Sequence, residues 1–262
     1  MSENFDKLVS VMARLRSADG CPWDREQTLQ TLRTYLLEET YETLDAIDRD
    51  DAEGMKEELG DLLLEVVFLC QVCSERDLFT IDQVAGSIHE KLIRRHPHVF
   101  GGEKAAGARE ALGRWEEMKN KEREASEETS VLAGVPEILP ALLRAFRISN
   151  KAAMVGFDWD NVAQILAKVD EELAELRQAI ASNDAGATAE ELGDLLFAAA
   201  NVGRLAGVDP ETALQAANRK FTRRFKSVEE GLRRSGLKPS AENRDLMEDL
   251  WDEAKAQSRG AR

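Results

Sequence analysis

Carboxylate side chains recur in this sequence in one pattern that occurs twice. The pattern is two adjacent glutamates, a third glutamate three residues later and, after a spacer, a glutamate and an aspartate three residues apart. The segment EELGDLL occurs at 57–63 and again, 133 residues further on, at 190–196. The carboxylates of the pattern are Glu38, Glu39, Glu42, Glu58 and Asp61 in the first copy, and Glu171, Glu172, Glu175, Glu191 and Asp194 in the second.

Apolar residues place the leading carboxylates on a face that is otherwise hydrophobic. Leu32, Leu36 and Glu39 follow one another at i, i+4 and i+7, which is one side of a helix. The second copy repeats this order with Ile165, Val169 and Glu172. A carboxylate that faces a core is unfavourable unless positive charge or a metal ion accompanies it. Solvated glutamate-rich helix faces are the alternative interpretation, and this spacing argues against it.

The spacing of the acids predicts a metal site. Carboxylates three residues apart lie side by side on a helix, and two such helices packed together bring four carboxylates to one point. Their mutual repulsion makes this arrangement unfavourable unless a divalent cation holds it. Ligand oxygens alone, without His or Cys, suit Mg²⁺, or Mn²⁺ in its place, rather than zinc.

Composition and charge restrict the classes of partner. The chain has 262 residues, of which 43% are hydrophobic, and a formal net charge of −15. Such an excess of acid disfavours direct binding to nucleic acid, although metal ions on the acids could attract a small polyanion. Because no apolar run approaches the length of a membrane span, we expect no membrane partner.

The three cysteines and the N-terminal residues favour a reducing compartment. Cys70 and Cys73 form a C-x-x-C in an apolar run without a second pair, so we interpret them as buried thiols rather than zinc ligands. The N-terminal segment lacks the continuous apolar stretch of a signal peptide. We therefore expect a cytoplasmic protein.

Helical periodicity runs through nearly the whole chain, and no stretch alternates like a strand. The expected helices cover 29–47, with Thr28 as N-cap, 52–75, 81–95, 162–181, 187–205 and 210–234. The sequence thus predicts an all-α protein of two tandem domains, each a bundle of four or five helices. We expect the domains at residues 1–123 and 137–262, with a linker at 124–136.

Three further features occur once in each half. A Trp-Asp pair precedes the acids, a K-x-x-R-R cluster follows them, and another Trp stands near the end of the half. Singly, such a tryptophan is usually packing and such a basic cluster a solvated face. Together, the acids, the basic cluster and the tryptophans are the groups that a metal, a polyphosphate and a base ring require. They are Trp23, Lys91, Arg94, Arg95 and Trp115 in the first half, and Trp159, Lys220, Arg223, Arg224 and Trp251 in the second.

The arrangement E-E-x-x-E, spacer, E-x-x-D resembles the signature of the all-α nucleoside triphosphate pyrophosphohydrolase superfamily. Over essentially its full length the chain resembles the tandem-domain MazG family. The segments GCPWD at 20–24 and RRHPHVF at 94–100 are similar to the first domain of that family. The segments RISNKAA at 147–153 and GFDW at 156–159 are similar to the lead into its second domain.

The resemblance implies an all-helical homodimer that hydrolyses nucleoside triphosphates to nucleoside monophosphates and pyrophosphate with Mg²⁺, acting broadly on the nucleotide pool. It implies a main metal site at Glu172, Glu175, Glu191 and Asp194, and a second, N-terminal site at Glu39, Glu42, Glu58 and Asp61. Lys220 and Arg224, with Arg223 beside them, would bind phosphate, and Trp251 would stack on the base. Glu38 and Glu171 would orient or deprotonate the attacking water, which makes Glu171, Glu172, Lys220 and Arg224 the expected catalytic residues.

We expect the second half to hold the main site. Lys168 there takes the position of Tyr35, and Asn218 that of His89. An added cation and a neutral amide suit a polyphosphate substrate. Two alternatives stay open: a narrow activity on dUTP, dCTP or an oxidised nucleotide, and a helical module that binds nucleotides without turnover.

Overall fold

The structure of the chain, a computed structural model, describes residues 3–102, 106–108, 110–111, 113–115, 118 and 130–260. Over these residues every regular element is a helix, which confirms the predicted all-α fold. The chain divides into two units, Met1–Ser126 and Glu127–Arg262, and each is described here by itself. The division falls inside the predicted linker, of which 124–129 lie outside the described residues. The domain boundaries at 123 and 137 stay predictions.

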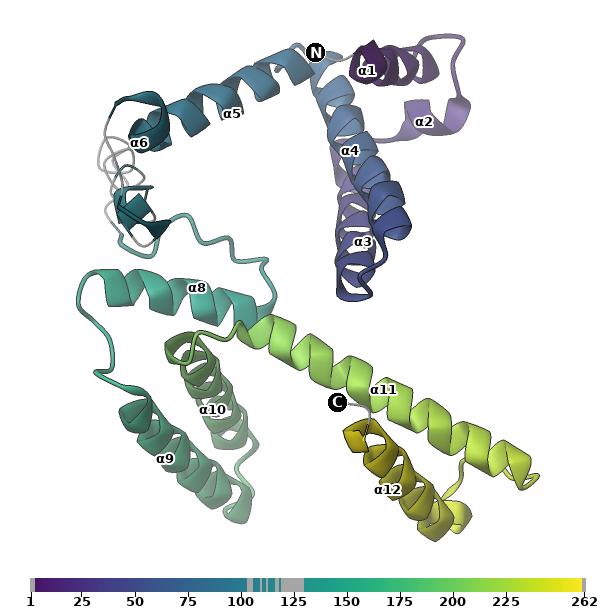
Figure 1. Cartoon of the computed structure of the whole chain (residues 1–262), viewed down its shortest axis with the longest axis vertical. Coiled ribbons are helices and arrows are strands. Elements are labelled where there is room, and N and C mark those ends of the chain that lie inside the picture. The colour runs from purple at the N-terminus through teal and green to yellow at the C-terminus, as the bar shows by residue number, and fades with distance from the viewer. Residues whose placement is uncertain are drawn as a thin grey trace. The chain divides into compact units, whose positions relative to one another are not determined.

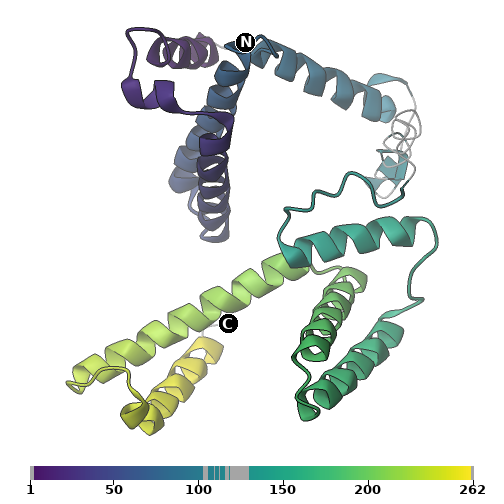
Figure 2. The same ribbon diagram turned by 180° about the vertical axis from the view of Figure 1, so that it is seen from behind.

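Unit 1 is built on a pair of helices, α3 (Leu29–Asp48) and α4 (Ala52–Ser74), joined by a short turn (Figure 1). α1 (Glu3–Leu15) packs against α4, and α2 (Pro22–Glu26) connects α1 to α3. The core between these helices consists of Met12, Leu32, Val67, Phe68 and Val72. α5 (Ile81–Arg95) runs away from the α3–α4 pair and ends at α6 (Pro97–Phe100) (Figures 1 and 2).

Unit 2 repeats the helix pair with α9 (Val162–Ala181) and α10 (Ala185–Leu205), and α8 (Ala141–Met154) packs on α10. α11 (Pro210–Arg234) begins beside the end of α10 and then diverges from the α9–α10 pair (Figures 1 and 2). A 3₁₀ turn (Ala241–Asn243) leads into α12 (Arg244–Gly260), which folds back along α11. These last two helices therefore form a hairpin with a core of its own, to which Val228, Leu232 and Ala254 contribute.

The turn between the paired helices is the same in both units. Asp50 and Asn183 adopt the left-handed conformation, with φ of 53° and 52°, which Asp and Asn tolerate better than other residues with a side chain. The next residue, Asp51 or Asp184, then caps the following helix by accepting backbone N–H groups. At the other end of α3, the predicted N-cap Thr28 is confirmed, because it accepts the N–H of Thr31. The sequence repeat is thus also a repeat of local structure.

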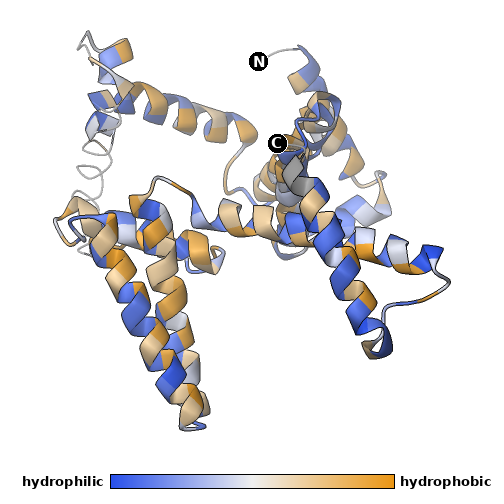
Figure 3. Ribbon diagram, turned by 60° about the horizontal axis from the view of Figure 1, so that its bottom comes forward, coloured by the Kyte–Doolittle hydropathy of each residue, from blue (hydrophilic) through white to orange (hydrophobic). Residues whose placement is uncertain are grey.

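Apolar side chains remain exposed on the helices of both units, and Figure 3 shows apolar positions among the polar ones along these helices. On α10, Leu192 and Leu196 are 46% and 49% exposed, and on α11 Phe221 is 57% exposed. A soluble helix ordinarily turns such a stripe toward another element. Among the described residues, no helix is long and apolar enough to cross a membrane.

Candidate metal and phosphate site

Three carboxylates of the second copy converge between α9 and α10. Oxygens of Glu172, Glu175 and Glu191 all lie within 4.8 Å of one another. Glu172 is buried, Glu191 is half-buried and Glu175 is exposed, so the group opens from the helix interface toward solvent. The fourth predicted ligand, Asp194, lies one turn beyond Glu191 and is exposed.

Electrostatics shows that these acids repel one another. The pKa of Glu191 is raised, first by burial and then by the charges of Glu175, Glu172 and Asp194. Carboxylates whose charges raise the pKa of a neighbouring carboxyl group in this way favour a cation in their midst. The donor set is oxygen only, which fits Mg²⁺ or Mn²⁺.

Lys168 is the cation that the structure places at this cluster. Its Nζ lies 2.7 Å from Glu171 Oε1 and 2.7 Å from Glu172 Oε1. Hydrogen bonds from the ammonium to Glu171 and Glu172 raise the pKa of Lys168, so it stays charged. The predicted water-activating acid and the most buried predicted metal ligand thus share one lysine.

The first copy forms a comparable cluster between α3 and α4. Oxygens of Glu39, Glu58 and Asp61 lie within 4.8 Å of one another, while Glu42 stands outside this group of three. Burial is the largest cause of the raised pKa of Glu39, followed by the charge of Glu42. Burial is also the largest cause of the raised pKa of Glu58.

One acid of unit 1 was not found from the sequence pattern. Glu65 is 7% exposed, and its Oε2 is buried with no hydrogen-bond partner among the described residues. Its pKa is raised to about 7, first by burial and then by the charges of Glu39 and Asp61. The available signal was a single glutamate inside the apolar run LLLEVVFLC, on the helix face that carries Asp61 four residues earlier.

The predicted phosphate and base residues form a group of their own on the α11–α12 hairpin. The guanidinium of Arg224 lies 5.9 Å from the ring centroid of Trp251, and the Phe221 ring lies 5.1 Å from that of Trp251. Lys220, Arg223 and Asn218 are on the same helix as Arg224. Because α11 diverges from the α9–α10 pair, this group and the acids stand on separate parts of unit 2 (Figure 1).

The first half contains the counterpart of that aromatic contact. The Arg95 guanidinium lies 5.3 Å from the ring centroid of Trp115. Arg95 and Arg224 are both the last residue of a K-x-x-R-R cluster. A cation over an indole ring is therefore a second structural repeat, beside the paired acids.

A buried arginine fixes the Trp-Asp segment in each unit. In unit 1 the Arg16 side chain, 7% exposed, pairs with Glu75 at 2.6 Å and donates to the carbonyls of Asp24 and Gln27. In unit 2 the Arg204 side chain, 6% exposed, pairs with Asp158, and its Nε donates to Asn201 at 3.0 Å. The sequence pattern gave no hint of these arginines, since they occupy different positions in the two halves.

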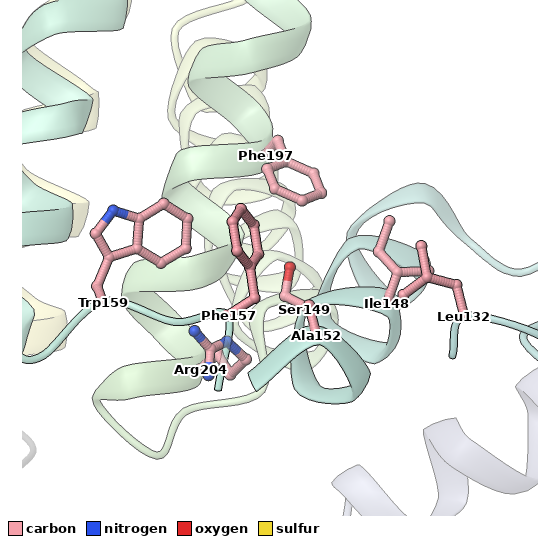
Figure 4. Close-up of a pocket in the computed structure, with 8 residues that line it drawn as sticks. All are labelled: Leu132, Ile148, Ser149, Ala152, Phe157, Trp159, Phe197 and Arg204. Atoms are coloured by element: carbon pink, nitrogen blue, oxygen red, sulfur yellow. The ribbon is translucent and has the colours of Figure 1, made fainter. Parts of the chain in front are cut away.

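The Trp159 segment of unit 2 also borders an apolar pocket of about 250 Å³ (Figure 4). The pocket is adjacent to the acids, because Phe197 in its wall is one turn beyond Asp194 on α10. Ser149 contributes a buried hydroxyl for which no partner is present among the described residues. The lining residues are Leu132, Ile148, Ser149, Ala152, Phe157, Trp159, Phe197 and Arg204.

Comparisons with known proteins agree with this organisation. The sequence profile of the MazG nucleotide pyrophosphohydrolase domain matches residues 27–100 and 160–229. Both acidic copies and Lys220, Arg223 and Arg224 fall inside the matched segments, whereas Trp251 falls outside them.

Similar proteins extend the match to nearly the whole chain. A nucleoside triphosphate pyrophosphohydrolase of Escherichia coli is 45% identical over 258 residues, which are 97% of either chain. The nucleoside triphosphate pyrophosphohydrolase/pyrophosphatase MazG of Thermotoga maritima is 44% identical over 251 residues, 96% of this chain and 95% of that one. The YabN protein of Bacillus subtilis is 43% identical over 97% of this chain, and the matched residues make up 52% of YabN.

Proposed function

This chain belongs to the MazG nucleotide pyrophosphohydrolase family, and we propose that it hydrolyses nucleoside triphosphates to nucleoside monophosphates and pyrophosphate. The nucleoside triphosphate pyrophosphohydrolase activity follows from relatives that match it almost end to end. The convergence of Glu172, Glu175 and Glu191 is the observation that supports placing the reaction at these residues. Pyrophosphate release, assayed across a panel of ribo- and deoxynucleotides, tests the proposal.

We propose Mg²⁺ as the cation, held in unit 2 by Glu172, Glu175, Glu191 and Asp194. The residues fit such an ion, since they offer only oxygens and the charges of the other three raise the pKa of Glu191. When bound, Mg²⁺ neutralises and polarises the phosphates, which lowers the barrier to displacement at phosphorus. Turnover that continues undiminished in EDTA would refute this assignment.

Lys168 and Glu171 are the residues we assign to the attacking water. Glu171 is next to the most buried acid of the cluster and accepts a hydrogen bond from Lys168. Its carboxylate can therefore hold a water and take its proton as the water attacks the α-phosphorus. Lys168 supplies positive charge near the polyphosphate, while Lys220 and Arg224 meet the charge of the leaving pyrophosphate. The alternative products, a nucleoside diphosphate and orthophosphate, would show that the attack is at another phosphorus.

A homodimer is part of the proposal. The α9–α10 pair exposes Leu166, Leu192 and Leu196, each between 46% and 49% exposed, so a second copy can complete a bundle by covering them. A dimer also provides a way to bring phosphate-binding residues close to the acids. Because Lys220 and Arg224 stand apart from the acids in one protomer, we propose that the hairpin of one copy serves the acids of the other.

Broad nucleotide specificity is supported by the kind of surface available to a base. The pocket beside Asp194 is apolar apart from the Ser149 hydroxyl, the Trp159 indole N–H and the Arg204 side chain, and Trp251 offers a ring face. Sites with few hydrogen-bonding groups discriminate weakly between ligands of similar shape. A single nucleotide that outcompetes all others in the panel would instead favour the narrow activity, and binding without pyrophosphate release would favour a non-catalytic module.

The protein is proposed to act in the cytoplasm. Cys21, Cys70 and Cys73 are all free thiols, as is usual in a reducing compartment.

A further inference from the structure

The wall of the apolar pocket in unit 2 contains a hydroxyl group that makes no hydrogen bond to the described residues. Ser149 on α8 is 7% exposed, and its Oγ is buried without a partner among those residues. Arg204 in the same wall is already engaged, because its Nε donates to Asn201 and its guanidinium pairs with Asp158. A buried hydroxyl without a partner is unfavourable, so its position in a pocket indicates a ligand that bonds to it.

The end of α8 brings aromatic rings to this hydroxyl. Gly156 adopts the left-handed conformation, with φ of 87°, and the N–H of Phe157 bonds to the carbonyl of Ala152 at 3.1 Å, which turns the chain back at the end of the helix. Phe157 lines the pocket although it is 82% exposed. In Figure 4 the nitrogen of Trp159 is on the side of its ring away from Ser149. An apolar pocket with exposed ring faces and one available hydroxyl suits a flat heteroaromatic ring.

Unit 1 has a large side chain where unit 2 has a small one in the pocket wall. Arg16 precedes Trp23 by seven residues, as Ala152 precedes Trp159 by seven. The Arg16 side chain is 7% exposed, and its guanidinium lies 5.5 Å from the ring centroid of Phe68. At the position where unit 1 buries an arginine, unit 2 therefore has a methyl group, which leaves room for a ligand.

The pocket begins one helical turn from the acids, because Phe197 in its wall follows Asp194 by three residues on α10. We propose that the base of the substrate nucleotide occupies this pocket and that the Ser149 hydroxyl positions the base by a hydrogen bond to its edge. A hydroxyl both donates and accepts, so it can bond to a carbonyl oxygen of one base or to an amino group of another. The inference rests on the proposed function, since it takes a nucleoside triphosphate as the ligand.

Calorimetric binding to the full-length protein tests the proposal. The ligands are the α,β-methylene analogues of ATP and UTP, which cannot be hydrolysed between the α- and β-phosphorus, and tripolyphosphate, which has no base. Ser149→Ala should weaken both analogues roughly 2- to 10-fold, the equivalent of one hydrogen bond. Ala152→Leu fills the pocket and should weaken them further. Neither variant should change the affinity for tripolyphosphate. In assays of turnover, Ser149→Ala should raise KM and leave kcat nearly unchanged, as loss of uniform binding does.

Ser182→Ala is the matched control, because it removes a hydroxyl outside the pocket that already bonds to the carbonyl of Ala179 at 2.9 Å. It should leave the binding of both analogues unchanged, with circular dichroism used to verify that all variants fold. Thermal unfolding adds a second readout: Ser149→Ala should be no less stable than the wild type, since the hydroxyl that it removes has no partner among the described residues.

Unchanged affinity for the analogues in Ser149→Ala or in Ala152→Leu would overturn the proposal, and so would an equal weakening of tripolyphosphate. The binding measurements need no turnover. A wild type that binds the analogues with the expected response to both variants, but releases no pyrophosphate from any nucleotide, would therefore contradict the proposed function and leave this inference in place.

Discussion

Glu172 is the carboxylate whose loss should reduce activity most, because it is buried and contacts Lys168. We expect Glu172→Ala, and likewise Glu175→Ala, to lower pyrophosphate release at saturating Mg²⁺ by about 10²-fold or more, since no nearby group replaces the lost oxygen. The matched changes Glu39→Ala and Glu42→Ala should leave most hydrolysis in place, because unit 1 has no equivalent of Lys168. Steady-state assays of the four variants, with folding verified by circular dichroism, give the comparison.

Other outcomes of that comparison are equally informative. A similar loss from both pairs would mean two working sites or tight coupling between the units. Loss from the unit 1 pair alone would reverse the assignment of the main site.

The ion pair between Asp158 and Arg204 should make the stability of unit 2 depend on pH. The hydrogen bond from Arg204 lowers the pKa of Asp158 below its ordinary value of 3.8. A lowered carboxyl pKa contributes stability that is present above the ordinary value and lost as pH falls through the lowered one. Asp158→Asn should therefore cost about 2 kcal/mol near neutral pH, because it leaves a buried guanidinium without its anion.

Urea denaturation of wild type and Asp158→Asn at several pH values measures this effect. The difference in unfolding free energy should shrink as the pH falls below 3.8, the ordinary pKa of the group. A difference that is the same at all pH values would mean that charge is not its cause.

At the scale of residues, the sequence predicted groups that repeat and missed groups that do not. The paired acids were predictable because carboxylates at i and i+3 on an otherwise apolar face are unfavourable unless a cation accompanies them. Glu65, Arg16 and Arg204 have no counterpart at the equivalent position of the other half. Their importance comes from burial and from the charged groups around them, which only packing determines. The separation of Arg224 from the acids could not be predicted from residue spacing either, because it depends on the direction of α11.

At the scale of elements, the direction of α11 depends on Gly203 near the end of α10. A Cβ at this position would lie 2.8 Å from the carbonyl oxygen of Val208, in the turn that leads into α11. Helix propensity alone would make Gly→Ala stabilising by about 1 kcal/mol. We expect Gly203→Ala to destabilise instead, by about 1–3 kcal/mol, because a backbone atom must move.

Gly193→Ala is the control on the same helix. A Cβ there meets nothing within 4 Å, so this variant should be neutral or slightly stabilised in denaturant unfolding. If Gly203→Ala behaves in the same way, the turn is more adaptable than its geometry indicates. If it also raises KM, the hairpin that begins at this turn takes part in binding the substrate.

Helix positions were the most predictable level of the structure. The expected helices at 81–95, 162–181 and 210–234 have the observed bounds, and 29–47 differs by one residue. Apolar periodicity and Asp or Thr caps mark such ends in the sequence. The way in which α11 leaves the α9–α10 pair could not be predicted, because it depends on a turn and on close packing such as that of Gly231 against Leu250.

At the scale of the whole molecule, a shared active site makes a specific prediction about mixed dimers. Glu172→Gln and Lys220→Ala should each be inactive alone. If one copy supplies acids and the other supplies the hairpin, a mixed dimer contains one intact site. Mixing equal amounts should then restore roughly a quarter of wild-type activity, since half the dimers are mixed.

The same mixing experiment has a clear negative result. No recovery, with subunit exchange demonstrated by a tagged copy, would place acids and hairpin of one site in a single protomer. A mass that stays monomeric at all concentrations in light scattering would exclude the shared site altogether.

The tryptophans of the two units give the protein an optical property. Trp115 and Trp251 lie beneath Arg95 and Arg224, Trp23 lies edge-on to Tyr35, and Trp159 lines the apolar pocket. These are all four indoles of the chain, at four separate places, two of them with a guanidinium over the ring. Intrinsic fluorescence therefore reports on one location at a time when three of them are replaced by Phe. A variant that keeps only Trp159 would show by its emission whether a nucleotide enters the pocket, without any label.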